Sequence, residues 1–278
     1  MAGPPPDASN PNILRDTFST DFANHSSAWD SLYQHDFHPW DRGGPSLALA
    51  DLLSQRTDLV PSAQQGEPTK RRTALVPGCG RGHDVLLLQS YGYDVWGLDV
   101  SADGIKRAKQ NVEEYHARGA IKPIDGVELG DAKFVVADFF ALDWTEGLGT
   151  EGSGKFDLIF DYTFLCALPP DIRPKWAKQM SQLLSPSGRL ICLEFPIGKP
   201  LSDRGPPWGL SPEVYEALLA HPGEELKYND DGSVIDPPSP KPQDGALHRL
   251  CLVKPTRTHK AGTNEDGTVR DFISVWSH

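Results

Sequence analysis

A glycine-rich turn and an acidic residue that follows it are the first candidates for chemistry in this sequence. The turn runs Gly78-Cys79-Gly80-Arg81-Gly82, and Asp99 lies 21 residues after Gly78. Glycine lets the backbone approach a ligand closely and adopt angles that other residues avoid. A carboxylate at the end of the following strand can accept hydrogen bonds from the hydroxyls of a ribose. The pattern predicts a site for a ligand that carries a nucleoside.

The spacing of the glycines separates two kinds of cofactor. A dinucleotide fingerprint that starts at Gly78 would need glycine at position 83, where this chain has His83. The observed G-x-G-x-G spacing resembles the loop of class I methyltransferases that binds S-adenosylmethionine (SAM), a cofactor without a pyrophosphate. We therefore expect SAM, with a nicotinamide or flavin cofactor as the alternative.

Asp138-Phe139 offers a second carboxylate next to an aromatic ring. The pair comes at the end of an expected strand, 133–137. There the carboxylate could accept a hydrogen bond from the adenine amino group, and the ring could cover the base. An isolated Asp-Phe pair is commonly a loop cap beside a core aromatic. Its register with the glycine turn and Asp99 favours the binding site.

Short apolar runs and helical stretches alternate from Thr73 onward. The expected strands are 73–76, 95–100, 133–137, 156–162 and 189–195, and helices are expected at 84–90, 103–118 and 172–184. This alternation predicts a parallel, doubly wound sheet. Two further strands, 247–254 and 269–276, are expected to close as an antiparallel pair. The fold class is therefore α/β, with a Rossmann-like, doubly wound, seven-stranded and mostly parallel sheet.

The remaining segments suggest how the chain is organised. Residues 1–14 are rich in proline and polar residues and are expected to form a disordered leader. A single SAM-dependent methyltransferase domain is expected over 15–278. It comprises an N-terminal helical lid (15–60) and a Rossmann-like core (72–278), with loop insertions at 223–245 and 255–268.

Composition excludes several classes of partner. The formal charge of -11 and the pI of about 5.2 would repel nucleic acid and anionic membranes. Neither a signal peptide nor an apolar stretch of about 20 residues is visible, and the four cysteines form no CxxC pair. We therefore expect a cytoplasmic protein, and we take a monomer as the default oligomeric state. The nine histidines show no metal-site spacing, so no metal is expected.

Several motifs match one family in order along the chain. The loop Leu75–Val85 resembles that of plant-type thiol/halide methyltransferases in the thiopurine methyltransferase superfamily. The likeness extends over roughly Trp29 to Ser211 and includes four further stretches, His38-Pro39-Trp40-Asp41-Arg42-Gly43, Phe156-Asp157-Leu158-Ile159-Phe160-Asp161-Tyr162, Arg173-Pro174-Lys175-Trp176-Ala177 and Leu184-Ser185-Pro186-Ser187-Gly188. In that family N-terminal aromatic residues fold over SAM. The resemblance implies cofactor contacts from Trp29, Tyr33, Trp40, Gly78, Gly80, Asp99, Asp138, Phe139 and Tyr162.

The same resemblance suggests the acceptor side of the site. We expect Asp161 and Tyr162 to border the transfer site and Trp208 to line the acceptor pocket, as the catalytic set. Trp208 stands in Gly205-Pro206-Pro207-Trp208, where the plant halide enzymes resemble Gly-Pro-Pro-Tyr. The region after Gly223 is longer than in that family and little related to it, so the resemblance does not identify the acceptor.

The expected reaction is transfer of a methyl group from SAM to a small soft nucleophile, namely a thiol, hydrosulfide, thiocyanate or halide. Such acceptors arrive ionised or nearly so, since a free thiol has a pKa of about 8.5, and a dedicated base is optional. One alternative is a SAM-binding regulatory protein that acts through a protein partner. Another is an O- or N-methyltransferase on a secondary metabolite, which commonly uses a histidine base. No histidine occurs between Tyr162 and Leu168.

Overall fold

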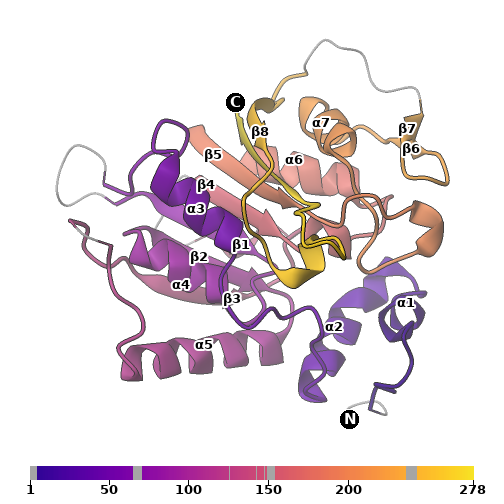
Figure 1. Cartoon of the computed structure of the whole chain (residues 1–278), viewed down its shortest axis with the longest axis horizontal. Coiled ribbons are helices and arrows are strands. Elements are labelled where there is room, and N and C mark those ends of the chain that lie inside the picture. Colours follow the sequence, from indigo (N-terminus) through magenta and orange to yellow (C-terminus); the bar gives the residue numbers. More distant parts are fainter. Residues whose placement is uncertain are drawn as a thin grey trace. The chain divides into compact units, whose positions relative to one another are not determined.

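The computed structural model describes residues 5–64, 71–124, 126–141, 143–146, 148, 154–235 and 243–278. Residues 1–4 of the expected leader, 65–70 of a polar linker and 236–242 of an expected insertion lie outside this set. Seven strands form one sheet in the order β3-β2-β1-β4-β5-β9-β8 (Figure 1). The pairs β1-β2, β2-β3 and β4-β5 are parallel, whereas β9 is antiparallel to both β5 and β8. The expected α/β fold with a mostly parallel, seven-stranded sheet is confirmed.

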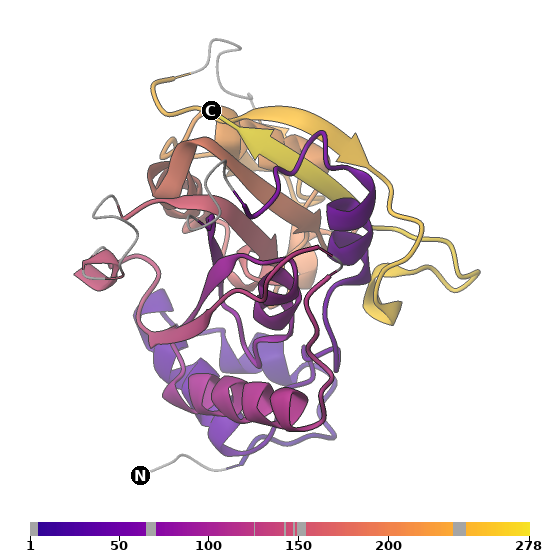
Figure 2. The ribbon, with the colours of Figure 1, turned by 90° about the vertical axis from the view of Figure 1, so that its left-hand side faces the viewer.

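Contacts divide the chain into two compact units, of which the first holds the described residues of Met1–Pro45 and Ser62–Glu146. Its elements are α1 (Ile13–Thr17), the 3-10 helix η1 (Phe22–Asn24), α2 (His25–Gln34), β1 (Thr73–Pro77), α4 (His83–Ser90), β2 (Asp94–Asp99), α5 (Ala102–Ala117), β3 (Ala132–Val136) and the 3-10 helix η2 (Asp143–Thr145). Helix α4 contacts all three strands, and α5, magenta in Figure 2, contacts β2 and β3. The glycine turn therefore joins β1 to α4, and Asp99 ends β2.

The second unit holds the described residues of Ser46–Pro61 and Gly147–His278. Its elements are α3 (Leu47–Gln55), β4 (Phe156–Tyr162), η3 (Leu165–Ala167), α6 (Arg173–Leu183), β5 (Leu184–Glu194), η4 (Leu201–Asp203), α7 (Pro212–Ala220), β6 (Lys227–Tyr228), β7 (Val234–Ile235), β8 (His248–Val253), η5 (Lys260–Gly262) and β9 (Phe272–Ser277). Helix α6 contacts β5 and α7, and α7 contacts β8. Asp161 and Tyr162 thus lie at the carboxyl end of β4.

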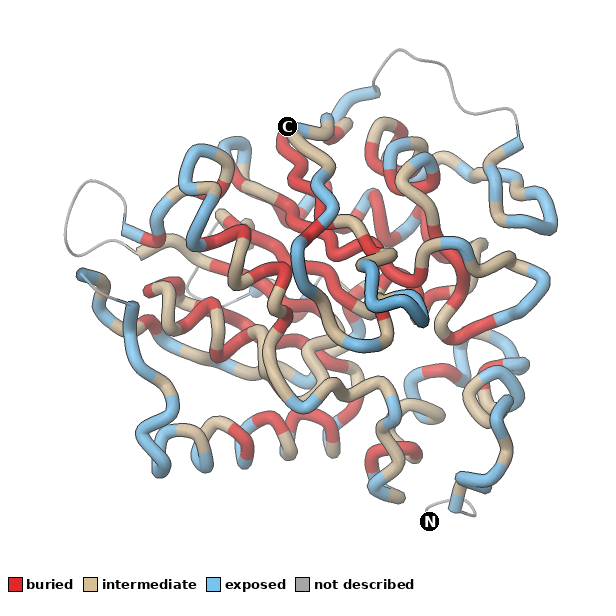
Figure 3. Tube along the Cα trace, viewed as in Figure 1, coloured by how far each residue is buried: buried red, intermediate tan, exposed pale blue. Residues whose placement is uncertain are grey.

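Local sequence accounts for the helix boundaries and for the buried faces. The Ser46 Oγ accepts a hydrogen bond from the Leu49 N–H at 3.2 Å, and the Ser101 Oγ accepts one from the Gly104 N–H at 2.9 Å, so a serine caps both α3 and α5. Figure 3 shows α5 with buried positions alternating with exposed ones, as expected for an amphipathic helix, and the strands β1, β2, β4, β5 and β9 are mostly buried. Among the described residues, no helix is long and apolar enough to cross a membrane.

The structure departs from the expected elements in two places. Strand β5 begins at Leu184, ahead of the strand expected at residues 189–195, because Phe156 pairs with Leu184 and Leu158 pairs with Arg189. Residues 185–188 are therefore an irregularity within the strand. The region after Gly223 also contains a hairpin of β6 and β7. Strands of two residues are too short to show a hydrophobic period, so the sequence suggested only a loop.

Candidate functional site

The glycine turn of the first unit has the backbone that its sequence predicts. Gly78, Gly80 and Gly82 have φ of 60°, 51° and 75°, in the left-handed region that favours glycine. Space is also limited, because a Cβ on Gly80 would lie 2.8 Å from the Tyr33 hydroxyl and one on Gly82 would lie 2.9 Å from the Phe134 ring. Gly80 and Gly82 are therefore needed both for the positive φ of the turn and because Tyr33 and Phe134 leave no room for a side chain.

Asp99 is held against this turn by two backbone donors. Its Oδ2 accepts a hydrogen bond from the Gly80 N–H at 2.9 Å, and its Oδ1 accepts one from the Ser101 N–H at 2.9 Å. Only 8% of the residue is exposed, and burial raises the pKa of its carboxyl despite these hydrogen bonds. A carboxylate oxygen has two lone pairs, so each can accept one more hydrogen bond. That geometry fits the two hydroxyls of the SAM ribose.

The N-terminal aromatic residues of this unit form one cluster. The rings of Trp29 and Trp40 are 4.9 Å apart, those of Tyr33 and Trp40 are 5.4 Å apart, and both pairs meet edge to face. The Trp40 Nε1–H donates to the Tyr33 hydroxyl at 3.1 Å. Burial and the nearby Asp99 raise the pKa of Tyr33 well above its ordinary value, so the phenol stays neutral. The structure therefore brings all three predicted lid residues together.

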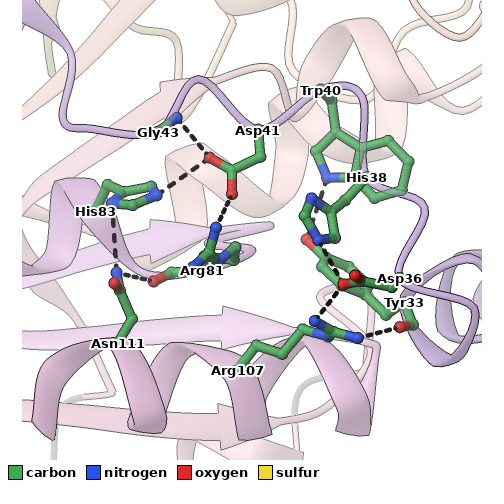
Figure 4. A network of polar contacts seen from close by, with 10 residues as sticks. All are labelled: Tyr33, Asp36, His38, Trp40, Asp41, Gly43, Arg81, His83, Arg107 and Asn111. Atoms are coloured by element: carbon green, nitrogen blue, oxygen red, sulfur yellow. Dashed lines mark hydrogen bonds and ion pairs between the residues drawn. The ribbon is translucent and has the colours of Figure 1, made fainter. Parts of the chain in front are cut away.

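A polar network around Asp41 ties the segment that carries Trp40 to the glycine turn (Figure 4). The Asp41 carboxylate contacts Arg81 Nη1 at 2.9 Å and His83 Nε2 at 3.1 Å, and it accepts the Gly43 N–H at 2.8 Å. Asn111 of α5 donates to the Arg81 carbonyl at 2.9 Å. Burial raises the pKa of Asp41, but hydrogen bonds from His83, Gly43 and Arg81 outweigh it and hold the pKa well below its usual range.

A second group of contacts ties the lid to α5. Arg107 bonds the Asp36 carboxylate at 2.7 Å and the Tyr33 carbonyl at 2.8 Å (Figure 4). The Asp30 carboxylate accepts from the Ser101 hydroxyl at 2.6 Å. The lid is thus held at α5 and at the glycine turn.

Asp138 and Phe139 follow β3 in the same unit. Asp138 is exposed and accepts the Phe140 N–H at 2.9 Å, whereas Phe139 is buried. The Ala137 N–H donates to the Asp99 carbonyl at 3.1 Å, which joins the ends of β2 and β3. An exposed carboxylate beside a buried ring suits recognition of adenine. Within the described chain, no group of three or more metal-ligating side chains gathers in one place.

In the second unit, Asp161 is buried and fully engaged. Its Oδ2 accepts from the Trp176 Nε1–H at 2.8 Å, and its Oδ1 accepts from the Leu165 N–H at 3.2 Å. Burial raises the pKa of Asp161 to about 6. Both oxygens hold the chain that continues from β4, so this geometry gives Asp161 a positioning role beside Tyr162.

Tyr162 lies among aromatic rings and meets a histidine. The Tyr162 hydroxyl is 3.2 Å from the His259 Nδ1, and the two rings stack with centroids 5.7 Å apart. Phe195 meets the Tyr162 ring edge to face at 6.2 Å. The next residue, Thr163, has φ of 64°, an unusual conformation for a β-branched residue. Such strain persists only where the surroundings fix the backbone.

Trp208 is attached to the loop that follows β4. Its N–H donates to the Cys166 carbonyl at 2.8 Å, and its side chain is mostly buried. The buried Arg173 donates from Nη2 to the carbonyl of the next residue, Gly209, at 3.0 Å. The predicted residues of the second unit, Asp161, Tyr162 and Trp208, are thus connected through the segment 161–166.

Sequence reasoning missed His259 and the partners of Asp41. His259 lies 97 residues after Tyr162, in a loop expected to be an insertion, and no motif marks it. For Asp41, the motif that contains it was visible, but its contacts with Arg81 and His83 are 40 and 42 residues away in sequence. Only the fold brings these residues together.

Comparisons with known proteins agree on one family. The family model described as thiopurine S-methyltransferase matches residues 24–247. Relatives include the probable thiol methyltransferase 2 of Arabidopsis thaliana, 37% identical over 77% of this chain and 81% of that protein, and the thiocyanate methyltransferase 1 of Brassica oleracea, 35% identical over 70% and 72%. The thiopurine S-methyltransferase of Vibrio campbellii is 28% identical over 65% and 80%.

Solved structures support the fold. A SAM-dependent methyltransferase of Anabaena variabilis has a TM-score of 0.53 at 14% identity, covering 100% of this chain and 98% of that chain. The 1,6-didemethyltoxoflavin-N1-methyltransferase of Burkholderia thailandensis has a TM-score of 0.52 at 15% identity, covering 91% and 87%. The family match and the sequence relatives show that the chain is a SAM-dependent methyltransferase and belongs to the thiopurine S-methyltransferase family.

Proposed function

We propose that this enzyme transfers the methyl group of SAM to a small soft nucleophile: a thiol, hydrosulfide, thiocyanate or halide. SAM supplies a methyl group on a positively charged sulfur, and its leaving group is a neutral thioether. No acid is needed to assist departure, so catalysis depends on holding the acceptor in line and on excluding water.

The residues of the first unit have separate roles toward the cofactor in this proposal. Asp99 accepts the ribose hydroxyls, Asp138 accepts the adenine amino group, and Phe139 covers the base. Trp29, Tyr33 and Trp40 offer aromatic faces and edges around the sulfonium, and ring faces attract cations. Gly78 and Gly80 let the backbone approach the nucleoside.

The observation that carries the acceptor assignment is the environment of Tyr162. The residue is 8% exposed and packs with Phe195 and His259, while both oxygens of the adjacent Asp161 are engaged by Trp176 and Leu165. Tyr162 therefore offers one hydroxyl on a neutral aromatic surface. A polarisable anion such as thiocyanate can accept that hydrogen bond. The names of the relatives, which refer to thiol, thiocyanate and thiopurine acceptors, support the same class.

A methyl-transfer panel tests this proposal. Labelled SAM is incubated with thiocyanate, iodide, hydrosulfide and simple thiols, with Asp99→Ala as the control. We expect labelled product from sulfur or halide acceptors and loss of product in the control. Cofactor binding without transfer to any of these acceptors would overturn the proposal and favour a regulatory role.

One observation favours a second candidate, methylation of an acidic oxygen. Such chemistry commonly uses a histidine base, and His259 supplies one 3.2 Å from the Tyr162 hydroxyl. Phenols are therefore included in the panel. Transfer to phenols at rates above those for all sulfur acceptors would establish this alternative.

A further inference from the structure

We propose that His259 is a positioning residue for Tyr162 and takes the proton of a thiol acceptor through the Tyr162 hydroxyl. This inference rests on the proposed function and refines it. It divides the acceptors into those that carry a proton and depend on His259, and those that arrive as anions and do not.

The first support is the geometry of the pair. The Tyr162 hydroxyl and His259 Nδ1 are 3.2 Å apart, within hydrogen-bond distance, and the rings lie within 17° of parallel. Tyr162 is nearly buried at the carboxyl end of β4, whereas His259 is partly exposed. A proton can therefore pass from a buried hydroxyl to a group that exchanges with solvent.

The second support is the way the loop that carries His259 is anchored. Arg257 makes a bidentate ion pair with Asp51 of α3, at 2.9 and 2.7 Å. Two residues past His259, the Ala261 carbonyl accepts a hydrogen bond from Arg270 at 2.9 Å. These contacts fix the loop on both sides of His259.

Asp271 is the positioning residue of this loop. It is fully buried, and its Oδ2 accepts the Thr258 hydroxyl at 3.2 Å. The Gly262 carbonyl accepts the Arg270 N–H at 2.8 Å, and a Cβ on Gly262 would collide with the Asp271 carboxyl group. Thr258 and Gly262 lie on either side of His259 in sequence, so Asp271 fixes the backbone that aims its ring at Tyr162.

The charged and titratable groups around His259 come from several elements. Tyr162 faces it from β4, and Asp271 lies behind its loop just before β9. Its own loop contributes Arg257 and Lys260, and Asp51 of α3 neutralises Arg257.

In the proposed step, each proton and each electron pair has a defined acceptor. The thiol S–H proton passes to the Tyr162 oxygen while the Tyr162 O–H proton passes to His259 Nδ1, which must be unprotonated beforehand. The sulfur lone pair forms the new C–S bond, and the old C–S bond leaves its electron pair on the cofactor sulfur. His259, now cationic, releases its proton to solvent. A thiocyanate or iodide ion has no proton to lose, and with it Nδ1–H can donate to Tyr162 while the Tyr162 hydroxyl donates to the anion.

Comparing two acceptors in His259→Asn tests the proposal. We expect kcat/KM for ethanethiol at pH 7 to fall about 100-fold, within the usual contribution of proton transfer, and kcat/KM for thiocyanate to fall less than threefold. The ethanethiol defect should shrink as the pH rises toward the pKa of ethanethiol, which lies above the value of about 8.5 for cysteine, because the acceptor then ionises unaided. His248→Asn, on an exposed position of β8, is the matched control and should change neither rate.

Further measurements distinguish a loss of proton transfer from a loss of stability and test the role of Asp271. Urea unfolding of His259→Asn should match that of the wild type. Asp271→Asn keeps an acceptor for Thr258 and should retain most ethanethiol activity, whereas Asp271→Ala and Gly262→Ala should lose it selectively over thiocyanate activity.

Three outcomes would overturn the assignment. An equal loss for both acceptors in His259→Asn, or no loss for ethanethiol, removes His259 from proton transfer while wild-type activity leaves the proposed function intact. Wild-type protein that methylates neither acceptor overturns the proposed function together with this inference.

Discussion

Asp41 of the first unit and the buried carboxyl groups of the second unit are held in different ways. In the first unit Asp41 contacts Arg81 and His83, and the pKa of its carboxyl is lowered despite burial. In the second unit burial raises the pKa of Asp161 to about 6 and that of Glu194 to about 7, and Asp161 accepts hydrogen bonds from the neutral Trp176 indole and the Leu165 N–H. Asp41 is thus paired with basic side chains, whereas Asp161, and also the buried Asp99 of the first unit, accept hydrogen bonds from neutral donors and have raised pKa values.

This difference has opposite consequences for stability. The contribution of Asp41 is present above its ordinary pKa of 3.8 and is lost as the pH falls toward its lower folded value. The contributions of Asp161 and Glu194 are present at low pH and are lost as the pH rises through their folded values. Asp41 thus limits the stable pH range from the acid side. Asp161 and Glu194, like the buried Asp99 with its raised pKa, limit it from the basic side.

The largest expected effect is the loss of SAM binding in Asp99→Ala. Each hydrogen bond to a charged group contributes about 1.5 to 3 kcal/mol, and Asp99 is proposed to make two with the ribose. We expect the SAM dissociation constant, measured by calorimetry, to rise by at least about 100-fold.

The matched control is Asp94→Ala, because Asp94 begins the same strand that Asp99 ends. Asp94 accepts the Asp131 N–H at 3.0 Å, a contact outside the glycine turn. SAM affinity within twofold of wild type is expected for this variant. Equal losses of SAM affinity in the two variants would show general damage to β2. They would contradict the role of Asp99 in binding the ribose.

The next effect concerns Glu194 and sharpens the contrast in pH dependence. Its pKa rises from 4.5 to about 7 because the group is buried. Ionisation should therefore cost the wild type about 3 kcal/mol between pH 4.5 and 7.5. Glu194→Gln should be more stable than wild type at pH 8 by roughly 2 to 3 kcal/mol, and within about 1 kcal/mol at pH 5. Urea unfolding at both pH values measures this difference, with the exposed Glu225→Gln as control.

The third effect tests whether the Asp41 network serves the cofactor. Asp41→Asn weakens the contacts with Arg81 and His83 that hold Trp40 near the glycine turn. We expect SAM to bind about tenfold more weakly, a loss of about 1.4 kcal/mol. The acceptor KM at saturating SAM should stay within twofold. Asp36→Asn breaks an exposed ion pair with Arg107 and should change neither constant appreciably. A raised acceptor KM in Asp41→Asn would contradict the proposal that the first unit binds the cofactor and the surroundings of Tyr162 bind the acceptor.

The fold was largely predictable because each element carries its own local signal. Alternating apolar runs indicate strands, Ser46 and Ser101 mark helix starts, and the glycine turn must lie between a strand and a helix. The hairpin of β6 and β7 and the irregular start of β5 carry no such signal. They depend on tertiary pairing, which overrides local preference.

The site was predictable only in part, for the same reason. Gly80 and Asp99 are linked by a fixed spacing across one strand–helix–strand unit, and the structure joins them by a hydrogen bond. His259 reaches Tyr162 across 97 residues, and Asp41 reaches His83 across 42. Spacing predicts contacts within a supersecondary unit, but a contact between distant segments requires the packed fold.

The smallest expected effect concerns the strained residue after Tyr162. A non-glycine residue in the left-handed region costs roughly 1 to 2 kcal/mol, and Thr163 at φ of 64° adds a β-branched side chain. Thr163→Gly removes this cost but loses the hydroxyl contact with the Tyr162 carbonyl at 2.6 Å and gains unfolded-state entropy. A net stabilisation of at most about 1 kcal/mol is therefore expected in urea unfolding.

Thr163→Gly also tests whether the backbone strain at Thr163 affects methyl transfer. If Thr163 fixes the backbone that aims Tyr162 at the acceptor, Thr163→Gly should lower kcat/KM for a thiol several-fold and leave the SAM dissociation constant unchanged. Thr163→Asn, which tolerates the left-handed region better than threonine, should lie between the two. Unchanged thiol turnover in a stabilised Thr163→Gly would mean that the strain is unrelated to the acceptor cluster. Among the described non-glycine residues of the first unit, only Asp36 has a positive φ. The strain at Thr163 would then need an explanation other than positioning Tyr162 for the acceptor.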